Sequence, residues 1–578
     1  MPIRGRVSHI LILGGAIALA AVVSLRPMAA APDDPNGTAD RTVEVSSSIR
    51  ITSDPHGRIF LEVRPLPGDG YSHLALRYTD TIDNWQELTK YNQDSSLEAN
   101  SFYRIPFGLL RNPFRYYVLR RLFPLDRPTE NGWEHKVGTG HYPADRESLW
   151  RIAEWFTGNG EKFRDLSRAN RIPDLIIHRG DTIRIPEELL LPLFSSEARV
   201  GESGLQFRDE KEGNVAVYRL RAGEALYSSV VIRFTGRLEA DEVNEVADQI
   251  AKRSSINNVR NIPIGYPIKI PRDLLLEEHL PRADLGRIEH DLRRAEIDSV
   301  RARARSGNLK GVYVILDPGH GGIDVGASRR GLRERDYVYD IMCRIKKVLE
   351  ENTAAEVLLT VKDSKTGVEV SDDRKLRRNG DAVILTNPPY HHTDVKLRAV
   401  AVNLRWYLSN SYYRDLTRKG VDPEKVVFTS IHADSLHSAV RGTMVYVPGE
   451  RFRRRTYGHK GKVYMRRAEV REKQYVKFSR SVRVRSEGLS RKFAEELIGE
   501  FNRENIAVHE YQPIRDHVIR QKHRWVPAIL RANEVPTKIL LEVCNLNNPE
   551  DNRLLTDPAF RQRIAEAYVQ AVVKLYQG

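Results

Sequence analysis

An internal repeat constrains the fold of this chain more than any other feature. In each copy a short apolar run leads into a turn, two segments with helical spacing follow, and a closing run ends in Ile-Pro. The spacing is clearest in the second copy, where Leu149, Ile152 and Phe156 fall on one helical face. The copies are residues 65–106, 141–186 and, more loosely, 217–271. The sequence therefore predicts three small β-α-α-β units before residue 272.

Composition excludes several classes of protein. With 40% hydrophobic and 29% charged residues over 578 positions, the chain can form buried cores and is neither disordered nor fibrous. It has only two cysteines, Cys343 and Cys544, which excludes a disulfide-stapled scaffold. We expect two buried free thiols, although an oxidising compartment would also permit their pairing. Residues 10–25 are the only long apolar run, which excludes a polytopic membrane protein.

The first 31 residues have the pattern of a secretory signal. Arg4 and Arg6 precede the apolar run, and three alanines at 29–31 follow it. Pro32 disfavours cleavage directly after residue 31, so residues 1–31 are either a signal peptide or an N-terminal anchor. We therefore expect an exported protein, located in the periplasm or cell envelope and either free there or anchored to the inner membrane. Residues 32–60 are predicted to be a polar linker.

From residue 311 to 578 the pattern changes to strands alternating with helices, which predicts an α/β sheet flanked by helices. A buried-strand run at 312–316 leads directly into a glycine-rich turn that holds His320. A second run ends at His432, and a third ends at Glu542. Glu334 opens a predicted helix between the first two. Strand ends of α/β sheets gather functional groups, so we expect these four side chains in one cleft.

These residue types favour a catalytic metal site. Zinc in such a site takes three nitrogen or oxygen ligands from the protein and keeps one position for water, and His320, Glu334 and His432 supply that set. A nearby carboxylate then accepts the proton of the water and passes it to the leaving nitrogen, a role that fits Glu542. Taken singly, each residue is better explained as a structural hydrogen-bonding or ion-pairing group; the combination favours Zn2+ chemistry.

The same residues lie in motifs that resemble the zinc-dependent N-acetylmuramoyl-L-alanine amidases. The motifs are DPGHGGIDVGASRRGLRERD at 317–336, SIHAD at 430–434, RGTMVYV at 441–447 and VPAILRANEVPTKILLEVCNLNN at 526–548. The resemblance covers residues 311–578 and implies cleavage of the amide between the lactyl group of N-acetylmuramic acid and the first L-alanine of the stem peptide. It implies zinc ligation by His320, Glu334 and His432 and catalysis by Glu542.

Two departures from the family pattern concern the pocket wall and an arginine. Cys544, Asn545 and Asn547 replace the small and aromatic residues that usually follow the catalytic glutamate. The Thr-Arg pair that follows the family's second strand is Thr360-Val361 here, so that arginine is either absent or supplied elsewhere. These differences affect the expected substrate preference more than the chemistry.

The three repeats resemble LysM modules, which bind glycans that contain N-acetylglucosamine. The resemblance is strongest in the second copy, through Leu149 to Ala153, Asn170 and the closing GDTIRIP. We assign LysM-like repeats to 61–110, 138–188 and 215–272, the last divergent, and expect peptidoglycan as their partner. Spacer or packing units are the alternative interpretation for all three.

Two further segments are charged. Residues 273–310 keep apolar residues at helical spacing and are predicted to form a linker helix, either solvated or docked on a neighbouring domain. Residues 449–487 contain 14 Lys plus Arg and 4 Glu, out of a net charge of +15 for the chain. This basic insertion indicates either contact with an anionic wall polymer or lipid, not nucleic acid, or a solvated arm. We also consider that an insertion covers the zinc cleft.

A second insertion, residues 362–395, carries His391 and His392. We expect both to be exposed and not to bind metal.

The sequence thus predicts a zinc-dependent peptidoglycan hydrolase that LysM-like repeats target to the wall. A catalytically inert or activator-dependent cell-wall-binding protein is the alternative, and a zinc peptidase acting within stem peptides is another. The retention of all four of His320, Glu334, His432 and Glu542 favours the enzyme. A protein activator, the oligomeric state and the physiological stage are left open.

Overall fold

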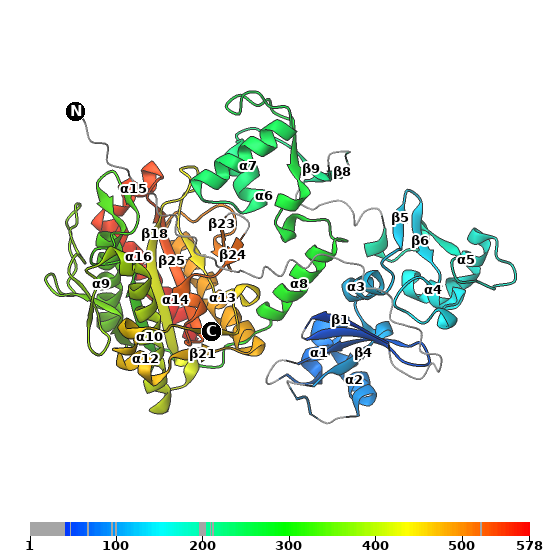
Figure 1. Ribbon diagram of the computed structural model, residues 1–578, viewed down its shortest axis with the longest axis horizontal. Coiled ribbons are helices and arrows are strands. Elements are labelled where there is room, and N and C mark those ends of the chain that lie inside the picture. The colour runs from blue at the N-terminus through cyan, green and yellow to red at the C-terminus, as the bar shows by residue number, and fades with distance from the viewer. Residues whose placement is uncertain are drawn as a thin grey trace, which may run out of the picture.

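The computed structural model describes residues 41–46, 48–65, 69–93, 96–98, 101–195, 204–208, 210, 213–520 and 523–577. Figure 1 shows a large α/β domain at the C-terminal end of the chain and three smaller β-α-α-β bodies before it. The predicted signal or anchor at 1–31 lies outside the described residues. Within the part that is described, no helix combines the length and apolar character needed to cross a membrane.

The first unit contains a four-stranded antiparallel sheet in the order β1-β2-β3-β4. Its elements are β1 (Arg41–Ser46), β2 (Ile49–Ser53), β3 (Ile59–Val63), α1 (Tyr71–Tyr78), α2 (Trp85–Asn92) and β4 (Tyr103–Pro106). Strand β3 pairs with β4, with Leu61 opposite Ile105, so both strands and both helices of the expected order are present. Residues 41–53, expected as polar linker, instead form β1 and β2, because β2 pairs with β3 and its Ile51 is buried in the core with the helices.

The second unit follows after helix α3 (Asn112–Leu122) and repeats this arrangement. Its elements are β5 (Arg127–Thr129), β6 (Gly132–Lys136), α4 (Leu149–Thr157), α5 (Phe163–Asn170) and β7 (Thr182–Pro186). Strands β6 and β7 pair antiparallel, with Trp133 opposite Ile185. Helix α4 begins after Ser148, whose side chain accepts a hydrogen bond from the Arg151 amide, and ends at Gly158 in the left-handed conformation.

The first two units share one hydrophobic core. Leu74 and Ile105 of the first unit belong to the same buried cluster as Trp133 and Ile152 of the second, and helix α3 lies within it. Across the junction, the Tyr142 hydroxyl donates to the Gly57 carbonyl oxygen at 2.7 Å. The pair is therefore one packed body, because neither unit has a separate core.

The third unit packs on the C-terminal domain. Its elements are β8 (Gln206–Arg208), β9 (Val215–Arg219), a π-helix (Leu226–Ile232), α6 (Arg233–Thr235), α7 (Ala240–Arg253) and β10 (Pro267–Pro271). Strands β9 and β10 pair antiparallel. Its core cluster includes Leu436, Val440 and Met444, which belong to the C-terminal domain. Figure 1 shows this unit above the large domain, separated from the first pair.

Helix α8 (Leu285–Asp298) is the predicted linker helix, and it is docked on both sides. Ile288 is buried in the core of the first two units. Ile297 packs with Val484 and Leu489 of the C-terminal domain. The alternative of a solvated linker is wrong, because the apolar stripe of the helix is divided between two partners.

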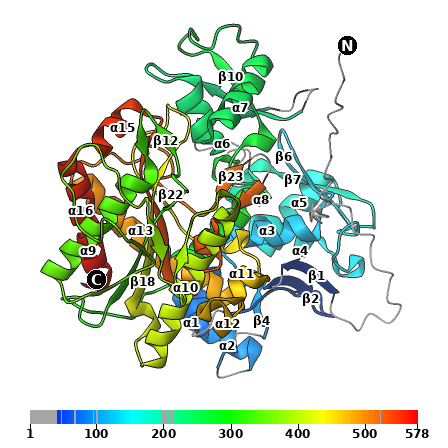
Figure 2. The same ribbon diagram turned by 60° about the vertical axis from the view of Figure 1, so that its left-hand side comes forward.

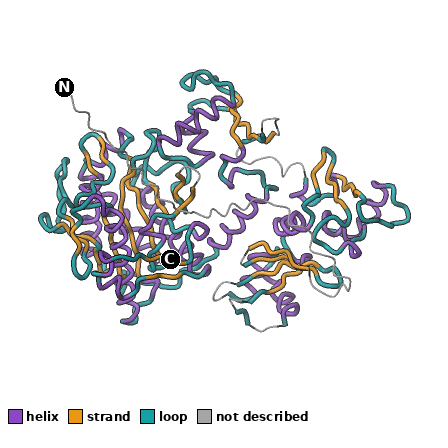
Figure 3. The backbone as a smooth tube through the Cα atoms, in the orientation of Figure 1, coloured by secondary structure: helices purple, strands orange, loops and turns teal. Residues whose placement is uncertain are grey.

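The C-terminal domain is built on a six-stranded sheet in the order β14-β11-β18-β25-β19-β22. The strands are β11 (Tyr313–Pro318), β14 (Glu356–Leu359), β18 (Val426–Asp434), β19 (Met444–Tyr446), β22 (Ile514–Arg515) and β25 (Thr537–Asn545). Strands β14, β11, β18 and β25 are mutually parallel, and β19 is antiparallel to β25. Figure 3 shows these strands with helices on both sides, which agrees with the predicted α/β architecture.

Each face of this sheet has its own core. Val314 and Leu316 point into a cluster with helices α9 (Glu334–Asn352), α13 (Arg480–Arg503) and α16 (Pro558–Gln577). Ile315 points the other way, into a cluster with α10 (Arg398–Arg418) and α14 (Ala528–Arg531). Figure 2 shows α9 and α16 on one side and α10 on the other. Burial on both faces explains why the strands are continuous apolar runs in the sequence. Cys343 and Cys544 are both buried and free, as expected.

Both insertions are folded. Residues 449–487 form β20 (Thr456–Gly458), α11 (Lys462–Met465), α12 (Ala468–Glu472), β21 (Tyr475–Lys477) and the start of α13. Tyr464, Val470 and Phe478 are buried in the α10 core, so the interpretation as a solvated arm is wrong. Residues 362–395 contribute to β15 (Val361–Asp363), β16 (Ala382–Ile384) and β17 (Tyr390–His391). The remaining elements are β12 (Ser328–Arg329), β13 (Leu332–Arg333), β23 (Val518–Arg520), β24 (His523–Trp525) and α15 (Pro549–Leu555).

Candidate metal centre

Three neighbouring parallel strands deliver the predicted site residues to one edge of the sheet. His320 follows β11, His432 lies near the end of β18, and Glu542 lies in β25. The register places His432 directly opposite Glu542. Because the strands are parallel, their carboxyl ends meet at one edge, where α/β sheets place their ligands. The structure thus brings together residues that are far apart in the sequence.

His320 is held by a carboxylate on one side of its ring. Its Nδ1 lies 2.9 Å from Oδ2 of Asp324, and its Nε2 lies 3.1 Å from Oε2 of Glu334. The residue has a φ of 64°, in the left-handed region, which turns its side chain out of the strand and into the cleft. Arg405 of α10 donates to the His320 carbonyl oxygen. Asp324 therefore fixes the ring so that Nε2 faces the centre, as second-shell carboxylates do at metal sites.

Glu334 is the first residue of α9, and its carboxylate is fixed by two backbone amides. Ala327 donates to Oε2 at 2.8 Å, and Ala433 donates to Oε1 at 3.1 Å. The position at a helix N-terminus also favours a negative charge. Its pKa is lowered, chiefly by the two histidines, in spite of burial that acts in the opposite direction. Glu334 is thus an ionised and oriented carboxylate that could serve as a metal ligand.

His432 completes the set. Its Nδ1 lies 2.9 Å from Oε1 of Glu334, and its Nε2 lies 3.2 Å from the Ser430 hydroxyl. Ser430 in turn donates to the buried Asp317 carboxylate at 2.7 Å. This chain of hydrogen bonds orients the second ring through β18 and β11.

Two glycines make room for these side chains. A Cβ atom at Gly319 would lie 2.5 Å from Cε1 of His432, and one at Gly326 would lie 2.4 Å from Oε2 of Glu334. Both distances are far below van der Waals contact. The glycines of the DPGHGG turn and of the following loop are therefore required by the crowding of the ligands, not only by the turn.

The three ligand atoms of His320, Glu334 and His432 lie within 4.8 Å of one another. Two imidazole nitrogens and one carboxylate oxygen around one point are the donor set of a catalytic zinc site. Neighbouring carboxylates raise the pKa of His320 to about 9, against the effect of burial. The centre is thus built to stabilise positive charge, and the residues fit a divalent cation that competes with protons for the histidines.

Glu542 lies beside this centre but outside the ligand cluster. Its side chain is 7% exposed, and its Oε2 is buried without a hydrogen-bond partner among the described residues. Burial raises its pKa well above the ordinary value, and the charges of Asp434 and Glu334 add to this effect. A buried carboxyl group with a raised pKa suits proton transfer next to a metal.

Sequence reasoning missed four residues around the site. Asp324 orients His320, Asp434 is the acidic neighbour of Glu542, and Arg405 contacts the His320 turn. Glu239, from the third unit, contributes negative charge near both Glu542 and Asp434. Asp324 and Asp434 stand within the quoted motifs, whereas Arg405 lies 85 positions after His320 and no local pattern indicates its contact.

The expectation that His391 and His392 are both exposed is wrong for His392. This residue is 4% exposed, and its Nδ1 lies 3.2 Å from the Gly321 carbonyl oxygen. It packs against the turn that carries His320, since its own carbonyl oxygen accepts a hydrogen bond from Ile323 at 3.1 Å. His392 therefore stabilises the turn that carries His320, and it is not one of the three residues of the candidate metal cluster.

Comparisons with known proteins agree on this domain. Residues 314–574 match the N-acetylmuramoyl-L-alanine amidase family model. The N-acetylmuramoyl-L-alanine amidase AmiA of Escherichia coli is 25% identical over 271 residues, which are 46% of this chain and 75% of that protein. An uncharacterized cell wall amidase of Bacillus anthracis is 24% identical over 269 residues, 46% of this chain and 36% of that protein.

The comparison with solved structures also returned an amidase. The CwlD amidase from Clostridioides difficile, in complex with the GerS lipoprotein, is 19% identical, with a TM-score of 0.29, and the match covers 46% of this chain and 98% of that chain. The family match spans His320, Glu334, His432 and Glu542.

Proposed function

We propose that this chain, whose residues 314–574 form an N-acetylmuramoyl-L-alanine amidase domain, is a zinc-dependent hydrolase of peptidoglycan. The bond cleaved is the amide between the lactyl group of N-acetylmuramic acid and the L-alanine of the stem peptide. The family match over residues 314–574 and the curated relatives support the N-acetylmuramoyl-L-alanine amidase class of enzyme. The observation that carries the zinc proposal is the cluster of His320, Glu334 and His432 beside the buried Glu542.

In this proposal each site residue has one role. His320 and His432 bind Zn2+ through ring nitrogens, and Glu334 binds it through a carboxylate that two backbone amides already hold. Bound zinc supplies a Lewis acid that polarises the scissile carbonyl and lowers the pKa of a water molecule. Asp324 keeps the His320 ring in the required orientation, which second-shell carboxylates commonly do.

Glu542 moves the proton. A positive charge at the centre favours its ionised form and offsets the burial that raises its pKa. The carboxylate accepts a proton from the attacking water as the new carbon–oxygen bond forms. It then donates that proton to the L-alanine nitrogen as the carbon–nitrogen bond breaks, which releases an amine and a lactyl carboxylate.

We further propose that the first two units are LysM-like and bind the glycan of the wall, in an exported protein. A groove of about 400 Å³ lies between them and is lined by Phe60, Tyr91 and Trp150. Tyr91 and Trp150 are 42% and 46% exposed, which is unusual for large aromatic side chains that share a groove. Holding the polymer there raises the effective concentration of the catalytic domain at its substrate.

Product analysis tests the enzymatic proposal. Purified zinc-loaded protein is incubated with peptidoglycan sacculi, and the soluble products are identified by mass spectrometry. We expect free stem peptides with N-terminal L-alanine from the wild type and none from Glu542→Ala, which keeps its zinc. Peptides cut between amino acids would indicate a zinc peptidase instead. Binding to sacculi without release would favour the inert or activator-dependent wall-binding protein.

A further inference from the structure

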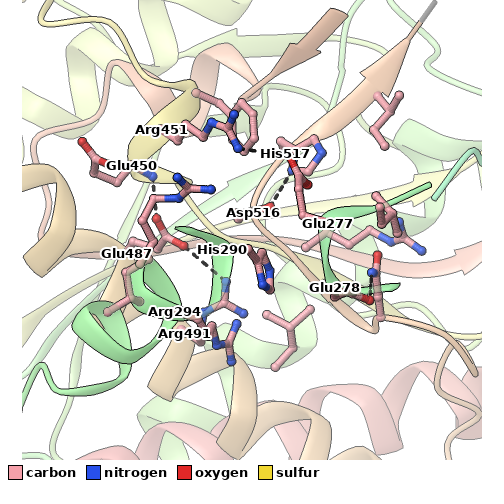
Figure 4. A pocket seen from close by; sticks show the side chains of 18 residues that line it. Glu277, Glu278, His290, Arg294, Glu450, Arg451, Glu487, Arg491, Asp516 and His517 are labelled. Atoms are coloured by element: carbon pink, nitrogen blue, oxygen red, sulfur yellow. Dashed lines mark hydrogen bonds and ion pairs between the residues drawn. The ribbon is translucent and has the colours of Figure 1, made fainter. Parts of the chain in front are cut away.

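Two neighbouring cavities lie beside helix α8, and they differ in charge. Figure 4 shows the first, of about 110 Å³, whose wall includes Arg491, Glu487, Asp516 and His517. Five arginines and five acidic residues line it. Its charges are paired: Arg491 donates to Glu487 at 3.3 Å, and His517 lies 2.5 Å from Asp516. This first cavity is a balanced ionic contact between α8 and the C-terminal domain.

The second cavity is larger and is not balanced. It has a volume of about 340 Å³ and lies between the first unit, α8 and the basic insertion. Seven arginines and three glutamates line it. The arginines are Arg64, Arg77 and Arg111 of the first unit, Arg293 of α8, and Arg451, Arg480 and Arg483 of the insertion and α13. The two cavities share Arg293, Arg451 and Glu450, so most of the excess positive charge comes from the arginines that line only the second cavity.

Four of these arginines have carboxylate partners. Arg77 pairs with Asp69 at 3.0 Å, and Arg451 with Glu277 at 3.1 Å. Arg480 donates to Glu296 at 2.9 Å, and Arg483 donates to Glu450 at 2.9 Å. These pairs account for the acidic side chains Glu296 and Glu450 of the cavity wall, and its third glutamate, Glu289, is engaged by Tyr117 and Arg121.

The other three, Arg64, Arg111 and Arg293, have no ion pair with any described residue. Arg111 donates only to backbone carbonyl oxygens, among them that of Leu76 at 2.7 Å. The Nε atoms of Arg64 and Arg111 are buried without an acceptor among the described residues. Burial lowers the pKa of Arg111, and burial together with the nearby charge of Arg451 lowers that of Arg293. Nearby carboxylates offset this only in part, Asp80 for Arg111 and Glu289, Glu277 and Glu450 for Arg293. A partly compensated cation in such a place is costly, and an added anion would relieve the cost.

We infer that this arginine-lined cavity binds a phosphate monoester. Three guanidinium groups on three separate elements face it without carboxylate partners, and a tetrahedral phosphate offers oxygens in three directions with up to two negative charges. A carboxylate offers two oxygens in one plane and one charge, so it matches fewer of them. Val45, Ile49 and Leu292 add apolar wall, which fits a carbon substituent on the phosphate. The volume lies in the range of small-molecule sites.

The phosphate monoester has two sources, a soluble compound or a lipid headgroup, and matched probes distinguish them. sn-Glycerol 3-phosphate and phosphatidylcholine vesicles that contain phosphatidic acid present the same headgroup in the two forms. Binding of each to the full-length protein is measured by calorimetry and by vesicle co-sedimentation, with glycerol and pure phosphatidylcholine vesicles as blanks. This site does not depend on the amidase chemistry, since it lies away from His320 and Glu542.

The decisive variant is Arg293→Gln, with Arg294→Gln as its control. The two residues are neighbours on α8, but Arg294 lines only the balanced cavity and pairs with Asp298 at 3.0 Å. We expect Arg293→Gln to weaken binding about tenfold or more, the size of one lost charge-assisted hydrogen bond, and Arg294→Gln to leave it unchanged. Arg64→Gln should match Arg293→Gln. Thermal unfolding of each variant shows that the fold is retained.

Each outcome decides the proposal. Binding of glycerol 3-phosphate that Arg293→Gln weakens supports a soluble ligand, and binding of phosphatidic acid vesicles alone, with the same dependence, supports a lipid headgroup. If neither probe binds the wild type, the inference is wrong. Binding that Arg293→Gln, Arg64→Gln and Arg294→Gln reduce equally also overturns it, because the effect would then be one of general charge.

Discussion

The first two β-α-α-β units and the third have the same order of elements but bury different faces. The first two pack on each other around a single core and leave Tyr91 and Trp150 exposed in the groove between them. The third packs on the C-terminal domain, where Tyr227 stacks on His437 with ring centroids 5.3 Å apart. A unit this small must bury a second surface, and its neighbour decides which one. Similar sequence patterns therefore give two different surfaces. The first two units form an open groove, and the third unit packs near the metal centre.

The largest effect of a substitution on activity is expected at Glu542, which lies beside the candidate metal centre. Glu542→Gln keeps the shape of the side chain but removes the proton acceptor, so we expect activity on sacculi to fall about 10²–10⁴-fold with zinc content unchanged. Zinc content is measured by atomic absorption, and product release by mass spectrometry. Glu495→Gln, at an exposed position of α13, is the control. Activity that survives Glu542→Gln would remove this residue from the mechanism.

Core truncation distinguishes the two packing arrangements. Ile152→Ala in the shared core should destabilise the first two units together by about 2–5 kcal/mol, while the third unit and the C-terminal domain keep their stability. Val440→Ala should instead weaken the junction of the third unit with the C-terminal domain. Hydrogen exchange read by mass spectrometry locates each loss. Increased exchange in the second unit alone after Ile152→Ala would contradict the shared core.

The first pair also carries a buried histidine that the third unit lacks at the equivalent place. His135 is fully buried between Asp126 at 2.8 Å and Glu147 at 3.2 Å, and these acids raise its pKa to about 9. The charged form of His135 is thus favoured in the folded state. Its contribution to the free energy of unfolding is complete below about pH 6.5, the ordinary pKa of histidine. This stabilisation, at most about 3 kcal/mol, is lost as the pH rises through 9.

Thermal unfolding of the first pair, followed between pH 6 and 10, measures this contribution. His135→Gln should abolish the pH dependence in that window. An unchanged profile in this variant would assign the effect to another group.

The smallest expected effect concerns the groove of the first pair. Trp150→Ala and Tyr91→Ala should each weaken binding to sacculi about three- to tenfold, the usual value of one aromatic contact. Trp85→Ala is the matched control, because Trp85 is 42% exposed on the same unit but does not line the groove. Co-sedimentation with sacculi measures the difference. Equal losses in all three variants would assign wall binding to another surface.

That His320, Glu334 and His432 lie together could be predicted from the sequence, because each of these residues follows a strong local signal. His320, His432 and Glu542 all stand at or near the end of a continuous apolar run, and such runs are strands buried on both faces. Glu334 starts a helix whose apolar residues recur at helical spacing. Strand, turn and helix starts are encoded by neighbouring residues, so these candidate ligands can be named from the sequence alone.

Contacts between distant segments could not be predicted in this way. Arg405 reaches the His320 turn from α10, and His392 is buried there because its loop folds back onto Gly321. Strands β1 and β2 have a polar composition that indicates a linker, and they form because the edge of β3 and a shared core are available. In each case a segment distant in the sequence, and not the local pattern, determines whether the residue is buried or the strand forms.

Helix α8 fixes the distance between the first two units and the C-terminal domain. Its 14 residues span about 21 Å, and its two ends are packed into different bodies, the first pair and α13. A flexible linker would instead let the C-terminal domain reach any bond within the length of that linker. If the proposed function holds, the docked helix sets the distance along the polymer between the glycan that the first pair binds and the amide that is hydrolysed, and α8 then determines the spacing of the cleaved bonds.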